Sequence, residues 1–553
     1  MGTIADKLTH LGQTKAAIRD AIISKGVTVP VETTFRDYAG KIREITADNG
    51  GINPEEEWKR PDDWLPIEDL VMVGDQKFVG LHAIFEDSNF VALSATGNYT
   101  VDWGDGKIEN FTDATVAYHT YSYADFEGTE STSGYRQAIV TVTPQPGQNL
   151  KSINLQLKHN PAGSSFYYST GWLDIRMAGQ YVDNLVIGGS GVYHGALEAF
   201  CFLGSNLITS YSSLFANCRF LQSVLIQDAS KGTDFSFMFS SCYALKIISL
   251  PNTVKGGNFN YMFMGCNSLK TILALDTSQG VTFRYMFTGC GSLEKIPLLN
   301  TSSGRYFDNM FNGCSMLRTI PLLDTSNGVH FQYMFSACVS LQTIPLLNTS
   351  KGTDFGCMFI SCSSLKRIPL LNTSNGTSFL AMFASNYLLQ TVPLFDTSNG
   401  TNFSSMFSGC ASLVTIPLLN TSKGTNFNSM FASNPLLRIA PLVDTSNGVD
   451  FANMFGYCTA LRTIPLLSTS NGTNFENMLA NCGTLSQARL LGTKNSISYQ
   501  NCRLSRTALV DIFSNLASGV VSKTITITNN WGAPLLTSED RDIAIKKGWT
   551  IVG

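Results

Sequence analysis

The chain is poor in charge for its size. Only 14% of its 553 residues are Asp, Glu, Lys or Arg, and a near balance of 38 basic and 41 acidic side chains leaves a net charge of −3. An average soluble protein has about a quarter of its residues charged. The sequence contains no Lys/Arg-rich tract of the kind that binds phosphate backbones, so we expect no nucleic-acid partner.

Long apolar runs are also missing. No stretch approaches the roughly 18–20 consecutive apolar residues of a membrane-spanning helix, so we expect no membrane insertion. The first residues are charged and amphipathic, unlike a secretory leader, and Asp6 stands where a myristoylation motif needs Ser or Thr. The sequence predicts a soluble protein made in a cytoplasm, with neither an export signal nor a wall anchor.

Catalytic and metal-binding motifs are absent from the sequence as well. There is no P-loop, no H-E-x-x-H, no G-x-S-x-G and no C-x-x-C pair, and the 6 histidines are scattered along the chain. A metal site would need His or Cys at ligand spacing. We therefore predict a protein that is not an enzyme and that uses no cofactor and no metal.

An internal repeat of 24 residues dominates what is present. Its Met positions are Met238, Met262, Met286, Met310, Met334, Met358, Met382, Met406, Met430, Met454 and Met478, with Leu214 one unit earlier. Around each Met the pattern is F-x-x-M-F-x-x-C-x-x-L-x-x-I-P-L-L-[ND]-T-S-x-G. One such unit cannot bury its apolar face alone, so the repeat predicts a solenoid of about twelve stacked coils.

Each part of the repeat predicts a local structure. The apolar residues of F-x-x-M-F-x-x-C-x-x-L are spaced three and four apart, which predicts a short helical or 3₁₀ turn with these side chains inward. The L-x-x-I-P-L part alternates and predicts a short strand, whose Pro removes one ladder donor and should lie at a strand edge. The Asx-Thr-Ser-x-Gly part predicts a turn built on an Asx side chain.

Ten of the 13 cysteines occupy one position of the repeat, four residues after the Met or Leu. Asn386 and Asn434 take that position in two coils. Exchange of Cys with Asn predicts an inward side chain that satisfies backbone groups within the turn. The Asn interruptions and the odd total argue against disulfides between stacked coils, so we predict reduced thiols.

The repeat closely resembles the BspA-type leucine-rich repeat of bacterial surface proteins and phage structural proteins, through M-F-x-x-C-x-x-L-x-x-I-P-x-L-[ND]-T-S. The resemblance covers about 290 residues and implies a binding scaffold.

Residues 1–48 form the one amphipathic helical segment, with two predicted helices. Their apolar residues are candidate docking contacts, namely Leu8, Leu11, Ile18, Ile22, Phe35 and Tyr38. The helices either pack on each other or on a partner, or form a coiled-coil homo-oligomer, because Ile4 to Ile22 also fits three heptads with Lys15 at one core position. The segment Leu8 to Val27, followed by T-F-R-D-Y-A-x-K-I, resembles an N-terminal module of tailed-phage tail and fibre proteins. The resemblance implies attachment to other virion (tail or baseplate) proteins.

A predicted β-sandwich precedes the repeats. Its motif Asp102-Trp-Gly-Asp-Gly106, followed by His119-Thr-Tyr121, resembles the W-G-D-G turn and H-x-Y of a PKD-type immunoglobulin-like domain. A calcium site at Asp102 and Asp105 is the alternative, although two carboxylates fall short of the six to eight oxygens that calcium takes.

The expected fold class is mainly β with short helical turns, a leucine-rich-repeat solenoid preceded by a helical module and an immunoglobulin-like sandwich. The expected parts are the virion-attachment module 1–48, a linker 49–66, the PKD-like sandwich 67–146, irregular leading coils 147–210, the repeats 211–502, and a C-terminal cap 503–553.

The position just before each Met is free to contact a receptor. In five consecutive coils it is Phe237, Tyr261, Tyr285, Asn309 and Tyr333. Stacked coils would place these side chains in one row, suited to sugar rings or to a protein partner. The alternative is that they pack against residues 147–210 or a neighbouring subunit.

The resemblances imply a phage tail fibre or receptor-binding protein of the virion, assembled in the host cytoplasm. It would attach by its N-terminus and present the solenoid to a host-surface glycan or protein. The alternatives are a bacterial adhesin of the BspA-type family, or a virion decoration protein that binds no receptor. An adhesin needs export signals, which favours the phage interpretation.

Overall fold

The computed structural model describes residues 58–159, 167–168, 170–189, 194–250 and 252–553. The chain separates into two compact units, Met1–Arg60 and Pro61–Gly553. The predicted helices of residues 1–48 and all six candidate docking residues lie outside the described residues. The second unit holds the predicted sandwich, solenoid and cap.

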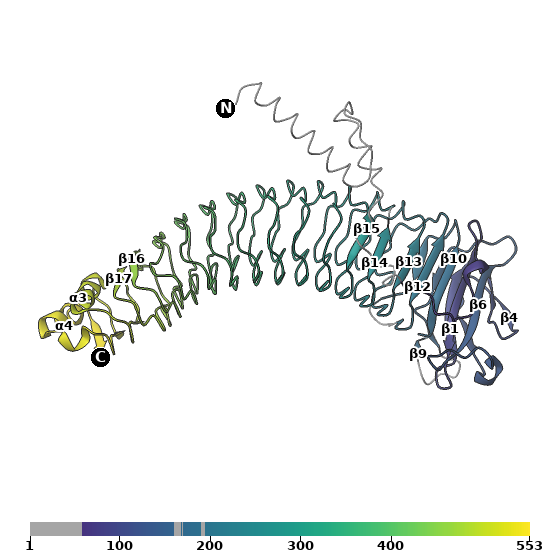
Figure 1. Ribbon diagram of the computed structural model, residues 1–553, viewed down its shortest axis with the longest axis horizontal. Coiled ribbons are helices and arrows are strands. Elements are labelled where there is room, and N and C mark those ends of the chain that lie inside the picture. The colour runs from purple at the N-terminus through teal and green to yellow at the C-terminus, as the bar shows by residue number, and fades with distance from the viewer. Residues whose placement is uncertain (1–57, 160–166, 169, 190–193, 251) are drawn as a thin grey trace, which may run out of the picture. The chain divides into compact units, whose positions relative to one another are not determined.

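Within its described residues the second unit is mainly β, with two α-helices near the C-terminus (Figure 1). The strands are β1 (Lys77–Ile84), β2 (Phe90–Thr96), β3 (Tyr99–Asp102), β4 (Ile108–Phe111), β5 (Ala117–Thr120), β6 (Arg136–Pro144), β7 (Ser152–Asn154), β8 (Lys158–His159), β9 (Tyr167–Tyr168), β10 (Trp172–Ala178), β11 (Asn184–Val186), β12 (Ala199–Leu203), β13 (Ser223–Ile226), β14 (Ile247–Leu250), β15 (Thr271–Leu275), β16 (Thr463–Ser468), β17 (Gln487–Leu491), β18 (Ile497–Ser498), β19 (Lys523–Thr526) and β20 (Trp549–Val552). The helices are η2 (Glu68–Leu70), η3 (Tyr123–Phe126), α3 (Arg506–Asn515), η4 (Ala533–Leu535) and α4 (Ser538–Ile545).

The first part of this unit is a sandwich of two sheets. One sheet has the strand order β13-β12-β10-β1-β6-β3-β4 and the other has the order β11-β7-β2-β5. Strands β3 and β5 bury alternate residues, whereas β1 and β10 are buried along almost their whole length. Trp103, Trp172 and Tyr99 lie fully buried in the core. The alternating strands of the sequence therefore form a sandwich, as its pattern predicts.

Both sheets change from antiparallel to parallel pairing where the sandwich meets the solenoid. Strand β10 pairs antiparallel with β1 but parallel with β12, which in turn pairs parallel with β13. In the other sheet β7 pairs antiparallel with β2 and parallel with β11. The sandwich thus covers the edge that the first coil would otherwise expose, and residues 147–210 supply strands to both parts.

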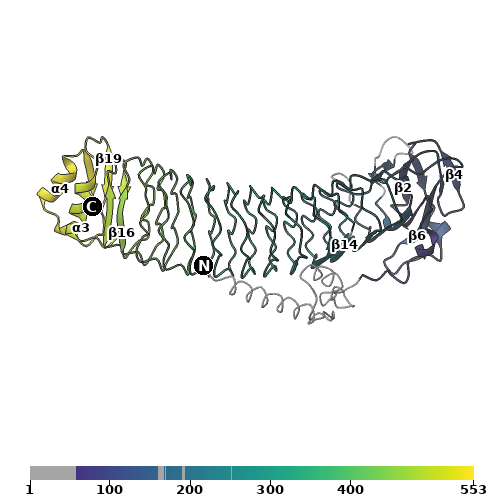
Figure 2. The same cartoon turned by 90° about the horizontal axis from the view of Figure 1, so that it is seen from above.

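The repeats stack into a β-solenoid of about 15 turns (Figures 1 and 2). Single-residue parallel bridges join the position before each repeat Phe to the same position one coil on, from Ser210↔Asp234 to Asp450↔Asn474. The Phe, Met, Cys and Leu positions are buried, which confirms the predicted inward set. Two stacks of parallel Phe rings run through the interior, with neighbouring centroids such as Phe379 and Phe403 at 5.7 Å.

The F-x-x-M-F segments form hydrogen-bonded turns rather than helices. In one coil the backbone N–H groups of Phe403, Ser405 and Phe407 donate to carbonyl oxygens of the next coil at 2.8–3.0 Å. The N–H groups of the intervening Met406 and Ser408 donate three residues back, at 3.2 and 3.0 Å. Met406 and Ser408 therefore make the predicted 3₁₀-type bond. The residues that alternate with them do not, because their N–H groups link this coil to the next.

The predicted strand of the L-x-x-I-P-L segment is wrong for the coils from Pro297 to Pro441. Strands form at β14, β15 and β17, which contain no Pro, and at β16, which pairs with β17. Proline lacks the N–H group that a ladder requires. Without a ladder the segment buries residues three apart, since Ile296 and Leu299 are buried while Leu298 is 73% exposed.

The repeat cysteines and the Asx-Thr-Ser turns hold neighbouring coils together. The Cys410 thiol donates to the carbonyl of Phe383 at 3.1 Å, and the Asn386 amide nitrogen donates to the carbonyl of Phe359 at 2.8 Å. The prediction that this position satisfies backbone groups is thereby confirmed. All thirteen cysteines are free and buried. The Asp396 carboxylate accepts the backbone N–H of Ser398 at 3.0 Å, as the predicted Asx turn requires.

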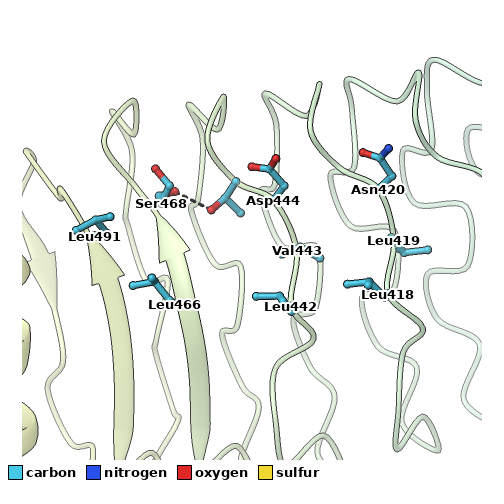
Figure 3. Close-up of a pocket in the computed structure, with 10 residues that line it drawn as sticks. Leu418, Leu419, Asn420, Leu442, Val443, Asp444, Leu466, Ser468 and Leu491 are labelled. Atoms are coloured by element: carbon cyan, nitrogen blue, oxygen red, sulfur yellow. Dashed lines mark hydrogen bonds between the residues drawn. The ribbon is translucent and has the colours of Figure 1, made fainter.

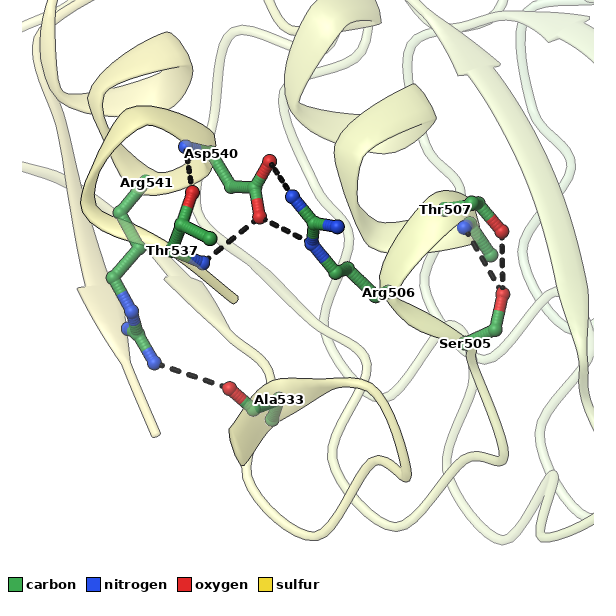
Figure 4. A network of polar contacts seen from close by, with 8 residues as sticks. Ser505, Arg506, Thr507, Ala533, Thr537, Asp540 and Arg541 are labelled. Carbon is green, nitrogen blue, oxygen red and sulfur yellow. Dashed lines mark hydrogen bonds and ion pairs between the residues drawn. The ribbon is translucent and has the colours of Figure 1, made fainter. Parts of the chain in front are cut away.

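The C-terminal residues close the solenoid with a sheet of β18, β19 and β20 and two helices. Thr537 and Asp540 form a capping box at the start of α4 (Figure 4). The Asp540 carboxylate also accepts two hydrogen bonds from Arg506 of α3, at 2.6 and 3.1 Å. These charge-assisted bonds lower the pKa of Asp540 and tie the two helices together.

Candidate binding surface

Three residues of the predicted row form one continuous stack of rings. The centroids of Phe237 and Tyr261 lie 4.4 Å apart and those of Tyr261 and Tyr285 lie 4.6 Å apart, with interplanar angles of 6°. Phe237 is 37% exposed and the two tyrosines are half-buried. The stack, which we call the aromatic row, presents ring edges and two phenol groups beside one another.

The aromatic row has a backbone conformation that disfavours bulky side chains. Phe237, Tyr261 and Tyr285 have φ values of 56°, 58° and 56°, in the left-handed region. The inter-coil hydrogen bonds impose this conformation, because the N–H of Tyr261 donates to the carbonyl of Arg284 at 2.9 Å. Other coils place Asn, Ser, Ala or Cys at this position, and one places Tyr333 there. Aromatic residues here cost conformational energy, and such strain is concentrated at functional sites.

Polar side chains continue the surface next to Tyr285. Arg284 donates to the Asp308 carboxylate at 3.0 Å and its guanidinium lies 4.3 Å from the centre of the Tyr306 ring. Tyr306 stacks on His330 at 5.5 Å, and His330 lies 3.9 Å from the same carboxylate. Rings with planar hydrogen-bonding groups at their margin can bind a sugar, which offers an apolar face and a rim of hydroxyl groups.

Tyr333, the fourth predicted member, is separated from the stack by Asn309. It packs against a small apolar cluster that contains Cys357 and Ala381. A hydrogen bond with Cys357 raises the pKa of Tyr333 to about 12. Tyr333 therefore contacts the next coils, and the structure brings only Phe237, Tyr261 and Tyr285 together.

The side chains of the motif Asp102 to Tyr121 contact groups within the motif itself. Trp103 stacks on His119 at 4.8 Å, and the His119 ring nitrogen lies 2.8 Å from the Asp105 carboxylate. The Asp102 carboxylate accepts the N–H of Gly104 at 3.0 Å, which closes the turn. Among the described residues, no group of three or more His, Cys, Asp or Glu is placed to hold a metal ion.

A second exposed surface escaped the sequence analysis. The first leucine of each P-L-L segment, or its equivalent, points outward, and the set consists of Leu298, Leu322, Leu346, Leu370, Leu394, Leu418, Leu442 and Leu466. Their exposure ranges from 46% to 73%. We call this set the leucine row. Two adjacent leucines of an extended segment cannot both point inward, so the doubled Leu was the signal available in the sequence.

The C-terminal half of the leucine row borders a groove of about 550 Å³. Leu418, Leu442, Leu466 and Leu491 line it on successive coils (Figure 3). Asn420 and Asp444 form its other margin.

In the part of the chain that the structure describes, no helix is long and apolar enough to cross a membrane.

Comparison with known proteins identifies one family. The model for "Mycoplasma protein of unknown function, DUF285" matches five overlapping segments, residues 205–296, 233–343, 283–392, 329–441 and 377–494. Together these matches cover more than half of the chain. A search of curated proteins found no match.

Two solved structures of repeat proteins are similar over much of their length. The plant peptide hormone receptor RGFR1 in complex with RGF2 is 10% identical, with 74% of this chain and 81% of that chain covered and a TM-score of 0.20. The TLR13–ssRNA13 complex is 11% identical, with 68% and 78% covered and a TM-score of 0.16. These scores are too low to indicate a shared fold.

Proposed function

Because the chain belongs to the DUF285 family of BspA-like repeat proteins, we propose that it is a non-enzymatic binding scaffold of a phage virion. It acts as a tail fibre or receptor-binding protein, assembled in the host cytoplasm, which attaches by residues 1–48 to tail or baseplate proteins. Its solenoid faces the host, and the aromatic row contacts a surface glycan. The observation that carries the binding role is the exposed stack of Phe237, Tyr261 and Tyr285.

The aromatic row supports this proposal because packing alone does not account for it. Three bulky rings occupy a left-handed backbone position that the other coils fill with Asn, Ser, Ala or Cys, apart from Tyr333, which packs against Cys357. Their stacking offers an apolar surface next to Arg284 and Asp308, which can donate to and accept from hydroxyl groups. Selection for a ligand gives a reason to keep aromatic residues there.

The virion role is supported by the two resemblances outside the repeats. The N-terminal segment resembles tail and fibre modules. The proposed PKD type of the sandwich is supported by contacts of the turn Asp102 to Gly106 with His119 and Tyr121, in which the Tyr121 hydroxyl donates to the carbonyl of Trp103 at 3.0 Å.

The proposal is tested with the full-length protein carrying Tyr261→Ser and Tyr285→Ser. We expect adsorption to host cells, and binding to their purified surface polysaccharide, to fall at least tenfold because two stacking rings are lost. The melting temperature should stay unchanged, since both rings lie at the surface.

Tyr457→Ser is the matched control. Tyr457 is 56% exposed and has a φ of 64°, but it lies seven coils away from Tyr285 in the repeat. It should bind as the unmodified protein does. A double variant that melts and adsorbs normally would refute the receptor role, and one that melts at a lower temperature would show that the row is a packing element.

A further inference from the structure

We infer that the leucine row is an interface between two copies of this chain. The row is an unbroken line of eight leucines, one on each of eight successive coils, and each is at least 46% exposed. Single exposed leucines are ordinary on protein surfaces, but a contiguous apolar line marks an interaction surface. This inference does not depend on the aromatic row or on its ligand.

The exposed area of the row matches what a stable dimer needs. At exposures of 46–73%, the eight side chains present on the order of 900 Å² of apolar surface, against about 800 Å² per partner in a standard interface. The leucines alone therefore supply an interface of ordinary size. The fully buried centre of such interfaces is depleted in charged residues, and the leucine row contains no charged residue.

The regular spacing of the row makes it complementary to itself. Each coil advances by the same distance along the solenoid axis. The spaces between neighbouring leucines of the row therefore have the same period in both copies of the chain. Leucines of one copy can enter the gaps of the other along the whole line, including the groove beside Leu442 and Leu466 (Figure 3). A twofold pairing uses the same patch on both subunits, which is the commonest form of oligomer.

The rest of the repeat surface does not offer a comparable line. Leu388 and Leu436 are exposed, at 45% and 49%, but the equivalent position is Ser, Thr or Ala in eight of the eleven coils that contain the repeat Met. They are isolated apolar residues on the same coils as Leu394 and Leu442. They provide controls that match the row in residue type and exposure.

Cross-linking at the centre of the row tests the pairing in the full-length protein. Leu394 lies next to the midpoint of the eight leucines, so a fully overlapped dimer places it opposite its own copy if the two solenoids run parallel and about one coil (~5 Å) from it if they run antiparallel. Because all native thiols are buried, a short bismaleimide should react with the cysteine introduced by Leu394→Cys. We expect most of the protein to migrate as a covalent dimer.

Leu388→Cys is the control and should remain largely monomeric under the same treatment. Adding Leu346→Glu and Leu442→Glu to Leu394→Cys should reduce the cross-linked fraction at least tenfold, whereas adding Leu388→Glu and Leu436→Glu should leave it unchanged. The cross-link reports on this surface even if the N-terminal segment also associates. The inference is overturned if Leu394→Cys cross-links no more than Leu388→Cys, or if the row substitutions have no effect.

Discussion

Replacing Phe403 by Ala removes one ring from an interior stack of the solenoid. Phe403 is fully buried, and its ring centroid lies 5.7 Å from that of Phe379 and 5.8 Å from that of Phe427. The substitution therefore leaves a void between two coils and deprives two neighbouring rings of their partner.

The expected loss is about 4 kcal/mol of local unfolding free energy. Phe→Ala in a core costs roughly 3–5 kcal/mol, and each lost aromatic pair contributes about 0.5–1.5 kcal/mol to such a cost. The coils cannot collapse into the void, because the N–H groups of Phe403 and Ser405 fix the backbone to the next coil at 2.9 and 2.8 Å. The loss should therefore lie in the upper half of the range.

Native-state hydrogen exchange is the suitable assay, because repeat arrays can open locally rather than as one unit. A loss of about 4 kcal/mol corresponds to roughly 10³-fold faster exchange of the amides that join this coil to its neighbours. Phe237→Ala, at an exposed position, should accelerate exchange less than tenfold. Equal effects of the two substitutions would refute the conclusion that the interior Phe stack stabilises the coils.

Three further outcomes are expected. Burial lowers the pKa of His82 to about 3 and that of His194 to about 4, so the unfolded chain takes up two protons below about pH 6.5 that the folded chain does not. Unfolding free energy should thus fall by roughly 2–2.5 kcal/mol per pH unit from these groups as the pH is lowered from 6 to 4.5, and urea titrations of the His82→Gln/His194→Gln variant should lack this component. Gly400→Ala should destabilise by about 1–3 kcal/mol, since its Cβ would lie 2.5 Å from the Cζ of Phe403, whereas Gly257→Ala, with its nearest neighbour at 3.9 Å, should melt normally. Titration with a thiol reagent should detect no reactive cysteine in the folded protein and all 13 after unfolding; several reactive thiols in the folded state would contradict their burial.

The sequence predicts the coil and its inward positions because a 24-residue period without insertions leaves one way to bury the repeated side chains. It does not show which backbone groups pair between coils. For this reason the short helical or 3₁₀ turn expected around Met406 is only partly right, since every second N–H donates to the next coil instead. The strands expected around Pro297 fail for a local cause, because proline supplies no ladder donor.

The candidate surfaces also depend on contacts between coils that a local sequence pattern does not show. The period alone places Tyr261 above Tyr285, but it does not show that Tyr333 turns to Cys357 instead of joining the stack. Nor does alternation within one coil show that Leu298 and its equivalents form a line, because the line exists only after stacking. The joining of the sandwich to the solenoid through β1 and β10 is likewise a long-range pairing without a local signal.

The alternating hydrogen bonds of the F-x-x-M-F turns have a mechanical consequence. A force applied along the solenoid axis loads the coils in series, so that the weakest junction opens first while its neighbours remain closed. Each released coil of 24 residues lengthens the chain by roughly 80 Å, in place of the ~5 Å that it occupied in the stack. The solenoid can therefore extend stepwise under tension and shorten again as coils restack, as an elastic tether does.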